Sequence, residues 1–216
     1  MKIEIKHLTK RIKRKTILDD INLSLDENKI YGFAGKNGCG KTMLFRCIAG
    51  LINATSGEVL VNGVKVGRGV FPNSLGLIIE NIELYNNLTA FDNLKLLSSL
   101  SKNKISDKQI KMWISKFGLD PDSDKKYDEF SLGMCQRLSL AQAFMEEPEL
   151  LILDEPTNAL DEKGVKCFHK IVKEAKEKGA TVLIASHSKE DINNLCNVIY
   201  TMYDGKITGV TVNENE

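Results

Sequence analysis

The sequence predicts an α/β fold of the phosphate-loop class, with a mainly parallel core sheet, an N-terminal antiparallel β subdomain and an all-helical insert. Apolar strands alternate with helical patterns, residues from about 87 to 145 have helical periodicity, and a glycine-rich loop joins an apolar strand to an apolar helix. We expect one domain over residues 1–216, in which 1–86 and 146–216 form the core with its β subdomain and about 87–145 form the helical subdomain.

Antiparallel strands dominate the start of the chain. Apolar and polar residues alternate over Met1–Leu8 and Ile21–Leu25, which predicts half-buried strands. The basic cluster within residues 10–15 between them is interpreted as a solvated hairpin tip, with a lipid or RNA contact as the less favoured alternative. Gly57–Val66 contains an Asn-Gly pair and predicts a second hairpin, and Leu75–Ile79 is a further apolar strand.

A phosphate-binding loop follows the short apolar strand Ile30–Ala34, because the next eight residues match G-x-x-x-x-G-K-[ST]. Its glycines allow successive N–H groups to point inward at phosphates, and the apolar stretch Met43–Ala49 predicts a helix whose N-terminus faces the same anion. Lys41 would contact the β- and γ-phosphates, and the Thr42 hydroxyl would ligate Mg²⁺. The predicted nucleotide-binding residues of this stretch are Gly35, Lys36, Asn37, Gly38, Cys39, Gly40, Lys41, Thr42 and Met43.

Helix start signals recur in the middle of the chain. Thr89, Ser106 and Ser131 each precede a helical pattern as an N-cap, and Gln109 completes a capping box with Ser106. Gly118 stops the second helix, whose apolar face is typical of a core, and the third helix is expected to run to about residue 146.

The C-terminal part returns to alternating strands and helices. The apolar run Leu150–Leu153 is typical of a parallel strand that is buried on both faces. An amphipathic helix is expected over Asp161–Lys178 and ends at Gly179. Further strands are expected at Thr181–Ala185, Asn197–Tyr203 and Lys206–Val212, the last two joined at Asp204-Gly205.

Two adjacent carboxylates, Asp154 and Glu155, directly follow the buried strand. The carboxyl ends of parallel strands are where ligands bind in open α/β sheets. One of the two can hold Mg²⁺ through water, and the other can accept a proton from an attacking water as a general base.

Composition narrows the functional classes. The net charge is +1, from 30 basic and 29 acidic residues, so no global field draws the chain to nucleic acid. Five cysteines form no C-x-x-C pair, which indicates reduced thiols in the cytosol. Cys39, in the phosphate loop, is interpreted either as a thiol activated by the helix N-terminus and Lys41 or as a small residue that fills space. No apolar run reaches the roughly 18 residues that cross a bilayer, so we expect any membrane span to come from another chain.

Phe130–Met134 followed by Cys135-Gln136-Arg137 resembles the signature motif of ATP-binding-cassette (ABC) ATPases. The motif order is also that of the family: phosphate loop, helical insert, signature, Asp-Glu pair, the D-loop Ala159-Leu160-Asp161 and a switch histidine at His187. The resemblance implies that two cassettes pack head to tail, so that Ser131 and Gly133 complete the nucleotide site of the other protomer. It also implies that Glu155 is the general base, that Asp154 serves Mg²⁺, that Asp161 belongs to the nucleotide site and that His187 contacts the γ-phosphate.

Two positions depart from the family pattern. Glu80 stands where the family usually has glutamine; it can still ligate Mg²⁺, or it simply replaces the amide. This glutamate and the run Leu84–Leu94 resemble the lantibiotic-immunity and peptide-antibiotic branch of bacterial ABC exporters. Ile12 stands where an aromatic residue usually stacks on adenine, so we expect weaker adenine discrimination by about 1 kcal/mol unless another ring, such as Tyr31, does the stacking.

The resemblance therefore implies an ATP-hydrolysing subunit that uses ATP and Mg²⁺ to power separate integral membrane permease subunits. We expect a second copy or a homologous ATPase subunit as partner, a cytoplasmic location peripheral to the inner face of the membrane, an antimicrobial peptide or drug as exported cargo, and no nucleic acid. The alternative is a soluble ABC protein that acts on nucleic acid or the ribosome, although such proteins typically carry two cassettes or a long coiled coil. A nucleotide kinase is less favoured because it would leave the signature unexplained.

Overall fold

Two β-sheets form the frame of the computed structural model, which describes residues 1–79, 84–101, 104–187 and 189–213. The smaller sheet is antiparallel, with strand order β2-β1-β4-β5. The larger sheet has the order β10-β9-β3-β8-β7-β6, and all its neighbours are parallel except β10 and β9. The strands are β1 (Ile3–Ile12), β2 (Lys15–Leu25), β3 (Ile30–Ala34), β4 (Ser56–Val61), β5 (Val64–Lys65), β6 (Leu75–Ile78), β7 (Leu150–Asp154), β8 (Thr181–Ser186), β9 (Val198–Tyr203) and β10 (Lys206–Val212).

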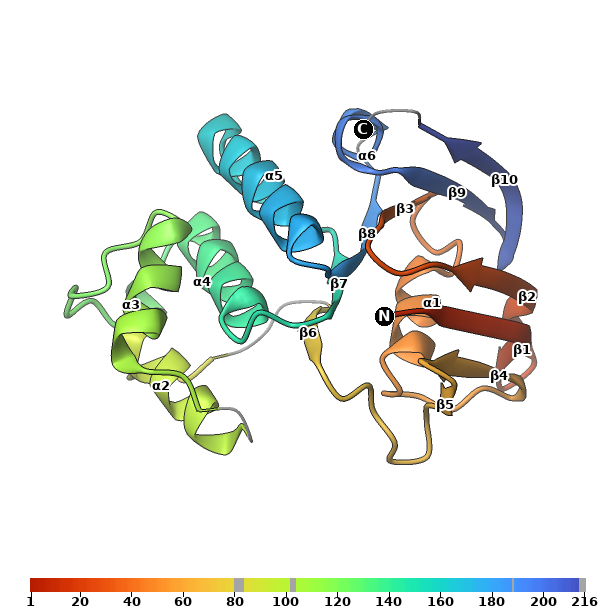
Figure 1. Ribbon diagram of the computed structural model, residues 1–216, viewed down its shortest axis with the longest axis horizontal. Coiled ribbons are helices and arrows are strands. Elements are labelled where there is room, and N and C mark those ends of the chain that lie inside the picture. The colour runs from red at the N-terminus through yellow and green to blue at the C-terminus, as the bar shows by residue number, and fades with distance from the viewer. Residues whose placement is uncertain (80–83, 102–103, 188, 214–216) are drawn as a thin grey trace.

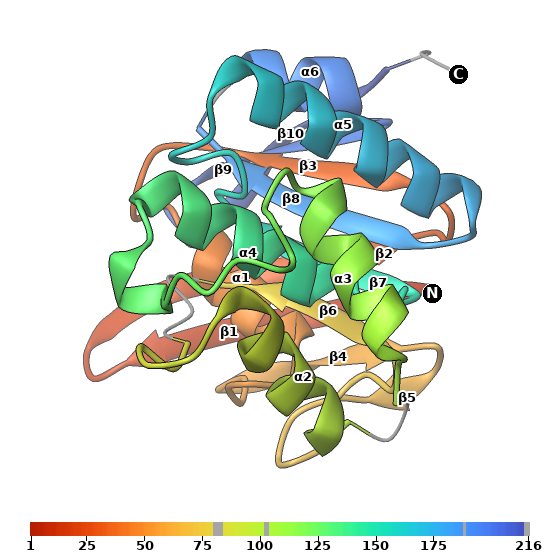
Figure 2. The same cartoon turned by 90° about the vertical axis from the view of Figure 1, so that its left-hand side faces the viewer.

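Helices cover both faces of the larger sheet (Figure 1). One helix lies between the two sheets, and Figure 2 shows α2 to α5 in front of the strands on the opposite side. The helices are α1 (Lys41–Ile48), α2 (Ala90–Leu100), α3 (Asp107–Lys116), α4 (Leu132–Phe144), α5 (Glu162–Glu177) and α6 (Lys189–Leu195), with a 3₁₀ turn at Tyr127–Glu129.

The central strand β7 explains why its sequence is apolar without alternation. Leu150 and Ile152 point into a core shared with α1 and the smaller sheet, whereas Leu151 and Leu153 point into a core shared with α2 to α6. Side chains alternate between the two faces of a strand, so a sheet covered on both sides needs apolar residues at every position. Burial of each such side chain stabilises the fold by about 1.5–3 kcal/mol.

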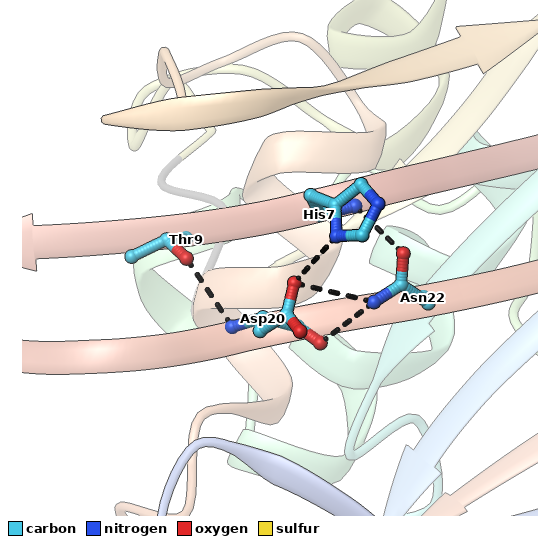
Figure 3. A network of polar contacts seen from close by, with 4 residues as sticks. All are labelled: His7, Thr9, Asp20 and Asn22. Atoms are coloured by element: carbon cyan, nitrogen blue, oxygen red, sulfur yellow. Dashed lines mark hydrogen bonds and ion pairs between the residues drawn. The ribbon is translucent and has the colours of Figure 1, made fainter.

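The β1–β2 hairpin is longer than the sequence pattern predicts, because β1 extends past Leu8 to Ile12 and β2 begins at Lys15. Its register is irregular where His7 and Asp20 adopt left-handed φ angles of 51° and 52°. His7 Nδ1 lies 2.9 Å from Asp20 Oδ1, and the His7 N–H donates to Asn22 Oδ1 at 2.8 Å (Figure 3). The hydrogen bond to His7 lowers the pKa of Asp20 below its usual value. The exposed network lies at the irregular part of the β1–β2 pairing.

The predicted helix starts are confirmed. Thr89 Oγ1 accepts the Asp92 N–H at 3.1 Å, Ser106 and Gln109 form the capping box, and Ser131 caps α4. The helical pattern between residues 87 and 145 is interrupted, however, because residues 117–131 form a connection with only the 3₁₀ turn. The short helix α6 was not predicted, since seven residues are too few to produce a clear 3.6-residue periodicity.

Candidate active site

Three parallel strands bring the predicted site residues to one edge of the larger sheet. Ala34 at the end of β3 pairs with Ser186 at the end of β8, and Asp154 at the end of β7 pairs with Ala185. The phosphate loop, the Asp-Glu pair and His187 each follow one of these strand ends. The fold therefore gathers three motifs that are far apart in the sequence at the place where open α/β sheets bind ligands.

The phosphate loop depends on two glycines with left-handed backbone angles. Gly38 has φ 80° and Gly40 has φ 112°, values that a residue with a Cβ rarely adopts. Gly40 is also the N-cap of α1 and has no side chain to occupy the first N–H groups of the helix. Those N–H groups and the positive end of the helix dipole are suited to an anion such as a phosphate group.

Lys41 lies buried against its own loop. Its Nζ donates to the carbonyl oxygen of Gly35 at 2.6 Å and to that of Lys36 at 3.5 Å. These bonds hold the ammonium group over the loop, where it can serve as the positive charge for a bound phosphate.

Thr42 and Asp154 meet across the site. The Thr42 hydroxyl donates to Asp154 Oδ2 at 2.5 Å, although 112 positions separate the two residues. Mg²⁺ prefers oxygen ligands and usually binds through one or two carboxylates together with substrate phosphates. The Thr42 and Asp154 oxygens fit that requirement, while no group of three or more His, Cys, Asp or Glu side chains in the described residues could hold a metal ion. Glu80, the third predicted magnesium ligand, lies outside the described residues.

Glu155 lies beside His187. Glu155 has φ 49°, and its N–H donates to the Ala185 carbonyl at 2.8 Å, which fixes the turn after β7. Its Oε2 lies 2.8 Å from His187 Nδ1 and accepts the His187 backbone N–H at 3.4 Å. The carboxylate is therefore held from the β8 side, next to Asp154.

The signature segment packs on the turn that follows Glu155. Gln136 Nε2 donates to the Pro156 carbonyl at 2.8 Å, and a Cβ on Gly133 would lie 2.9 Å from the Ala159 carbonyl. Ser131 Oγ accepts the Met134 N–H at 3.3 Å, while Leu132 beside it is 69% exposed. The first turn of α4 thus presents a capped but open helix start at the surface.

Asp161 makes its contacts within the chain. Its Oδ1 accepts the Gly164 N–H at 3.0 Å as the N-cap of α5 and lies 2.5 Å from a guanidinium nitrogen of Arg137. The bond from Gly164, and secondarily the charge of Arg137, lower the pKa of Asp161 below its usual range. Arg137 is part of the signature segment, but the motif by itself assigned it no role. Its fixed position at the end of the motif was the one sequence feature that could have drawn attention to it.

The Cys39 side chain faces the core rather than the solvent. It is 7% exposed and packs in the cluster between the two sheets, which favours the space-filling interpretation over a reactive thiol. Its carbonyl accepts the Gly205 N–H at 2.9 Å, so the turn between β9 and β10 supports the loop from behind. Sequence reasoning predicted that turn but missed this contact. All five cysteines are free, and burial raises the pKa of Cys47 to about 11.

The two side chains considered for adenine contact, Ile12 and Tyr31, are placed differently. Ile12 is 44% exposed at the end of β1, where it can offer apolar contact to a ligand. Tyr31 is buried and stacks on Tyr200 with ring centroids 6.2 Å apart, so its ring is already occupied within the core.

The fold and this edge define a nucleoside triphosphatase of the phosphate-loop class. A profile of the ABC transporter family matches residues 18–158. The chain is 48% identical over 206 residues to the uncharacterized ABC transporter ATP-binding protein YybJ of Bacillus subtilis (strain 168), covering 95% of this chain and 94% of that protein. It is 36% identical over 205 residues to the lantibiotic transport ATP-binding protein SrtF of Streptococcus pyogenes, covering 95% and 88%.

A solved dimeric structure of the ATP-binding cassette MJ0796, in a post-hydrolysis state bound to ADP and Pi, superimposes with a TM-score of 0.88 at 23% identity. The superposition covers 97% of this chain and 98% of that one. The chain therefore belongs to the ABC transporter family, as an ATP-binding subunit with ATPase activity. Within the described residues, none of the helices has the length and apolar character that a membrane span requires.

Proposed function

We propose that two cassettes, this chain with a second copy or a homologue, sandwich two MgATP and hydrolyse the γ-phosphate to power separate membrane permease subunits. The chain would then work at the inner face of the membrane through those subunits. This proposal rests on where one chain places its phosphate-binding and catalytic groups and where it places its signature residues. The phosphate loop, Asp154 and Glu155 lie at one edge of the larger sheet, whereas Ser131 caps the open start of α4 and Gly133 packs against the turn after Glu155.

The exposed start of α4 supports the head-to-tail arrangement. A capped helix start offers N–H groups and a positive dipole end to an anion, but it holds no group that could bind Mg²⁺ or remove a proton. Leu132 at the same place is 69% exposed, so the first turn of α4 is open to a partner. The phosphate loop of one cassette would therefore face the signature of the other, with ATP between them.

The chemistry follows from the groups at the sheet edge. Glu155 is placed to accept the proton of an attacking water, and His187 holds its carboxylate and is available to the γ-phosphate. Lys41 and the loop N–H groups bind the phosphates and stabilise the negative charge that the transition state carries. Thr42 and Asp154 would hold Mg²⁺, which neutralises phosphate charge when bound.

The cargo is proposed from relatives. The lantibiotic transport protein SrtF covers nearly the whole chain, which supports export of an antimicrobial peptide or drug. The matching experiment is deletion of the gene followed by growth in a panel of peptide antibiotics. Selective sensitisation to one peptide class, restored by the wild-type gene and not by Glu155→Gln, is expected; unchanged tolerance across the panel would contradict this choice of cargo.

The paired site is tested by the concentration dependence of turnover. The purified chain should hydrolyse MgATP with a specific activity that rises with protein concentration and levels off once dimers are formed. The oligomeric state is followed in the same samples by light scattering. Full specific activity in strictly monomeric samples would contradict the sandwich.

A further inference from the structure

Arg137 joins three segments that are distant in the sequence. One guanidinium nitrogen donates to the Phe117 carbonyl at the end of α3 at 2.9 Å, and another lies 2.5 Å from Asp161 Oδ1 at the start of α5. Arg137 itself lies on the second turn of α4, the helix that begins with the signature. The Arg137 side chain is 21% exposed and that of Asp161 is 63% exposed, so the guanidinium group is sheltered while the carboxylate faces solvent.

Two glycines leave room for the guanidinium group. A Cβ on Gly118, which has φ 76°, would lie 2.7 Å from one Arg137 nitrogen, and a Cβ on Gly164 would lie 3.0 Å from the other. A larger residue at either position would push the side chain away from its partners. The segments around Arg137 are thus shaped to receive a planar group with several donors, for which lysine is a poor substitute.

The turn after β7 is fastened to α4 along its length. Gln136 holds the Pro156 carbonyl, Gly133 lies close to the Ala159 carbonyl, and Arg137 holds the Asp161 carboxylate. The same turn begins with Glu155, and it contains left-handed angles at Glu155 (49°) and Ala159 (64°) that unrestrained residues of these types rarely adopt. A displacement of α4 is therefore passed to the segment that carries Glu155.

We propose that Arg137 is a positioning residue that couples the signature helix to Glu155 through Asp161. This inference rests on the proposed function, because the signature is taken to grip the nucleotide of the opposite site. A signature that closes on that nucleotide moves α4, and the Arg137–Asp161 pair transmits the movement to the turn that sets the Glu155 carboxylate. Nucleotide bound at one site therefore changes the position of Glu155 at the other site, which makes hydrolysis cooperative.

The test compares the split between kcat and KM in Arg137→Met, Arg137→Lys and Asp161→Asn. Arg137→Met should lower kcat about tenfold, since displacement of a catalytic group by a fraction of an ångström is costly, and should leave the KM for ATP nearly unchanged. The Hill coefficient should fall from near 2 toward 1.

Arg137→Lys should retain part of kcat, because lysine keeps the positive charge. It should not retain all of it, because one ammonium group cannot reach both partners as the planar guanidinium does. Asp161→Asn keeps an oxygen that can cap Gly164 and should match Arg137→Met, and the double variant should be no slower than either single variant.

Lys166→Met is the matched control, because it removes an exposed ion pair to Glu162 on α5 and should keep wild-type kcat and cooperativity. All assays are run well below the unfolding midpoint of each variant. Wild-type kcat and Hill coefficient in Arg137→Met, effects of the two sites that multiply, or an equal loss in Lys166→Met would each overturn the proposal. Concentration-independent turnover of the wild type would instead contradict the paired site, and the Arg137 effect on kcat remains readable in the same assay.

Discussion

Glu155 Oε2 and His187 Nδ1 lie 2.8 Å apart, and the same oxygen accepts the His187 backbone N–H, so the residues after β7 and β8 are joined by hydrogen bonds at the edge of the sheet. A carboxylate held this way has a fixed direction, which a general base needs more than it needs proximity alone. Because the same turn is held by α4, the orientation of Glu155 depends on both neighbours.

Glu155→Gln should lower turnover on the order of 10²-fold or more and leave ATP binding intact, because the amide keeps the shape and loses the proton acceptor. Turnover is measured by phosphate release and binding by a fluorescent ATP analogue. Glu149→Gln, outside the site, is the control and should behave as wild type. Normal hydrolysis by Glu155→Gln would show that another group is the base.

Thr42→Val should weaken Mg²⁺ binding, because it removes one of the two oxygens that meet at 2.5 Å while keeping the volume of the side chain. The Mg²⁺ concentration for half-maximal activity should rise at least several-fold, whereas Thr42→Ser should stay close to wild type. Chelation with EDTA should abolish turnover in all variants. An unchanged magnesium requirement in Thr42→Val would contradict the assigned ligand.

Ile12→Phe should strengthen ATP binding relative to GTP by about 1 kcal/mol, because a ring can stack on the base where isoleucine gives only apolar contact. The wild type should bind ATP and GTP with comparable affinity, measured by competition against the same fluorescent analogue. A strong ATP preference in the wild type would mean that a different group recognises adenine, and Tyr31 is excluded from that role by its burial against Tyr200.

Asp161 makes a prediction about pH. Its pKa in the folded chain lies below the ordinary value of 3.8, so its stabilising contribution is fully present above about pH 4 and is lost as the pH falls through the folded-state pKa. Urea unfolding should therefore show wild type more stable than Asp161→Asn at neutral pH, with the gap closing on acidification toward pH 3. Glu162→Gln, one residue along the same helix start, serves as control. If the stability difference between wild type and Asp161→Asn grew on acidification, it would contradict a lowered pKa of Asp161.

Local chemistry made most of the elements predictable. The caps at Thr89, Ser106 and Ser131 and the Asn62-Gly63 turn depend on neighbouring residues, and the structure has each of them where the pattern indicates. The apolar run of β7 likewise reports burial on both faces directly. Strand ends were less predictable, because the β1–β2 ladder continues through polar residues whose pairing no local pattern records.

Contacts between distant segments were the part that local patterns could not supply. Arg137 is an ordinary helix arginine until the fold brings Phe117 and Asp161 beside it. Gly205 is an ordinary turn glycine until its N–H meets the Cys39 carbonyl behind the phosphate loop. The burial of Cys39 has the same origin, since the cluster that covers it is assembled from both sheets.

The most direct measurement is complementation between two inactive variants. Lys41→Ala damages the phosphate loop and Ser131→Ala damages the signature, so each variant alone should be nearly inactive. In a one-to-one mixture that pairs at random, about half of the pairs are mixed, and each mixed pair contains one intact site and one doubly damaged site. Turnover should therefore rise clearly above that of either variant alone but stay below a ceiling of about a quarter of the wild-type value, because the doubly damaged site cannot activate its neighbour. No recovery in mixtures shown to exchange subunits, or full activity of Ser131→Ala on its own, would contradict a site shared between two chains.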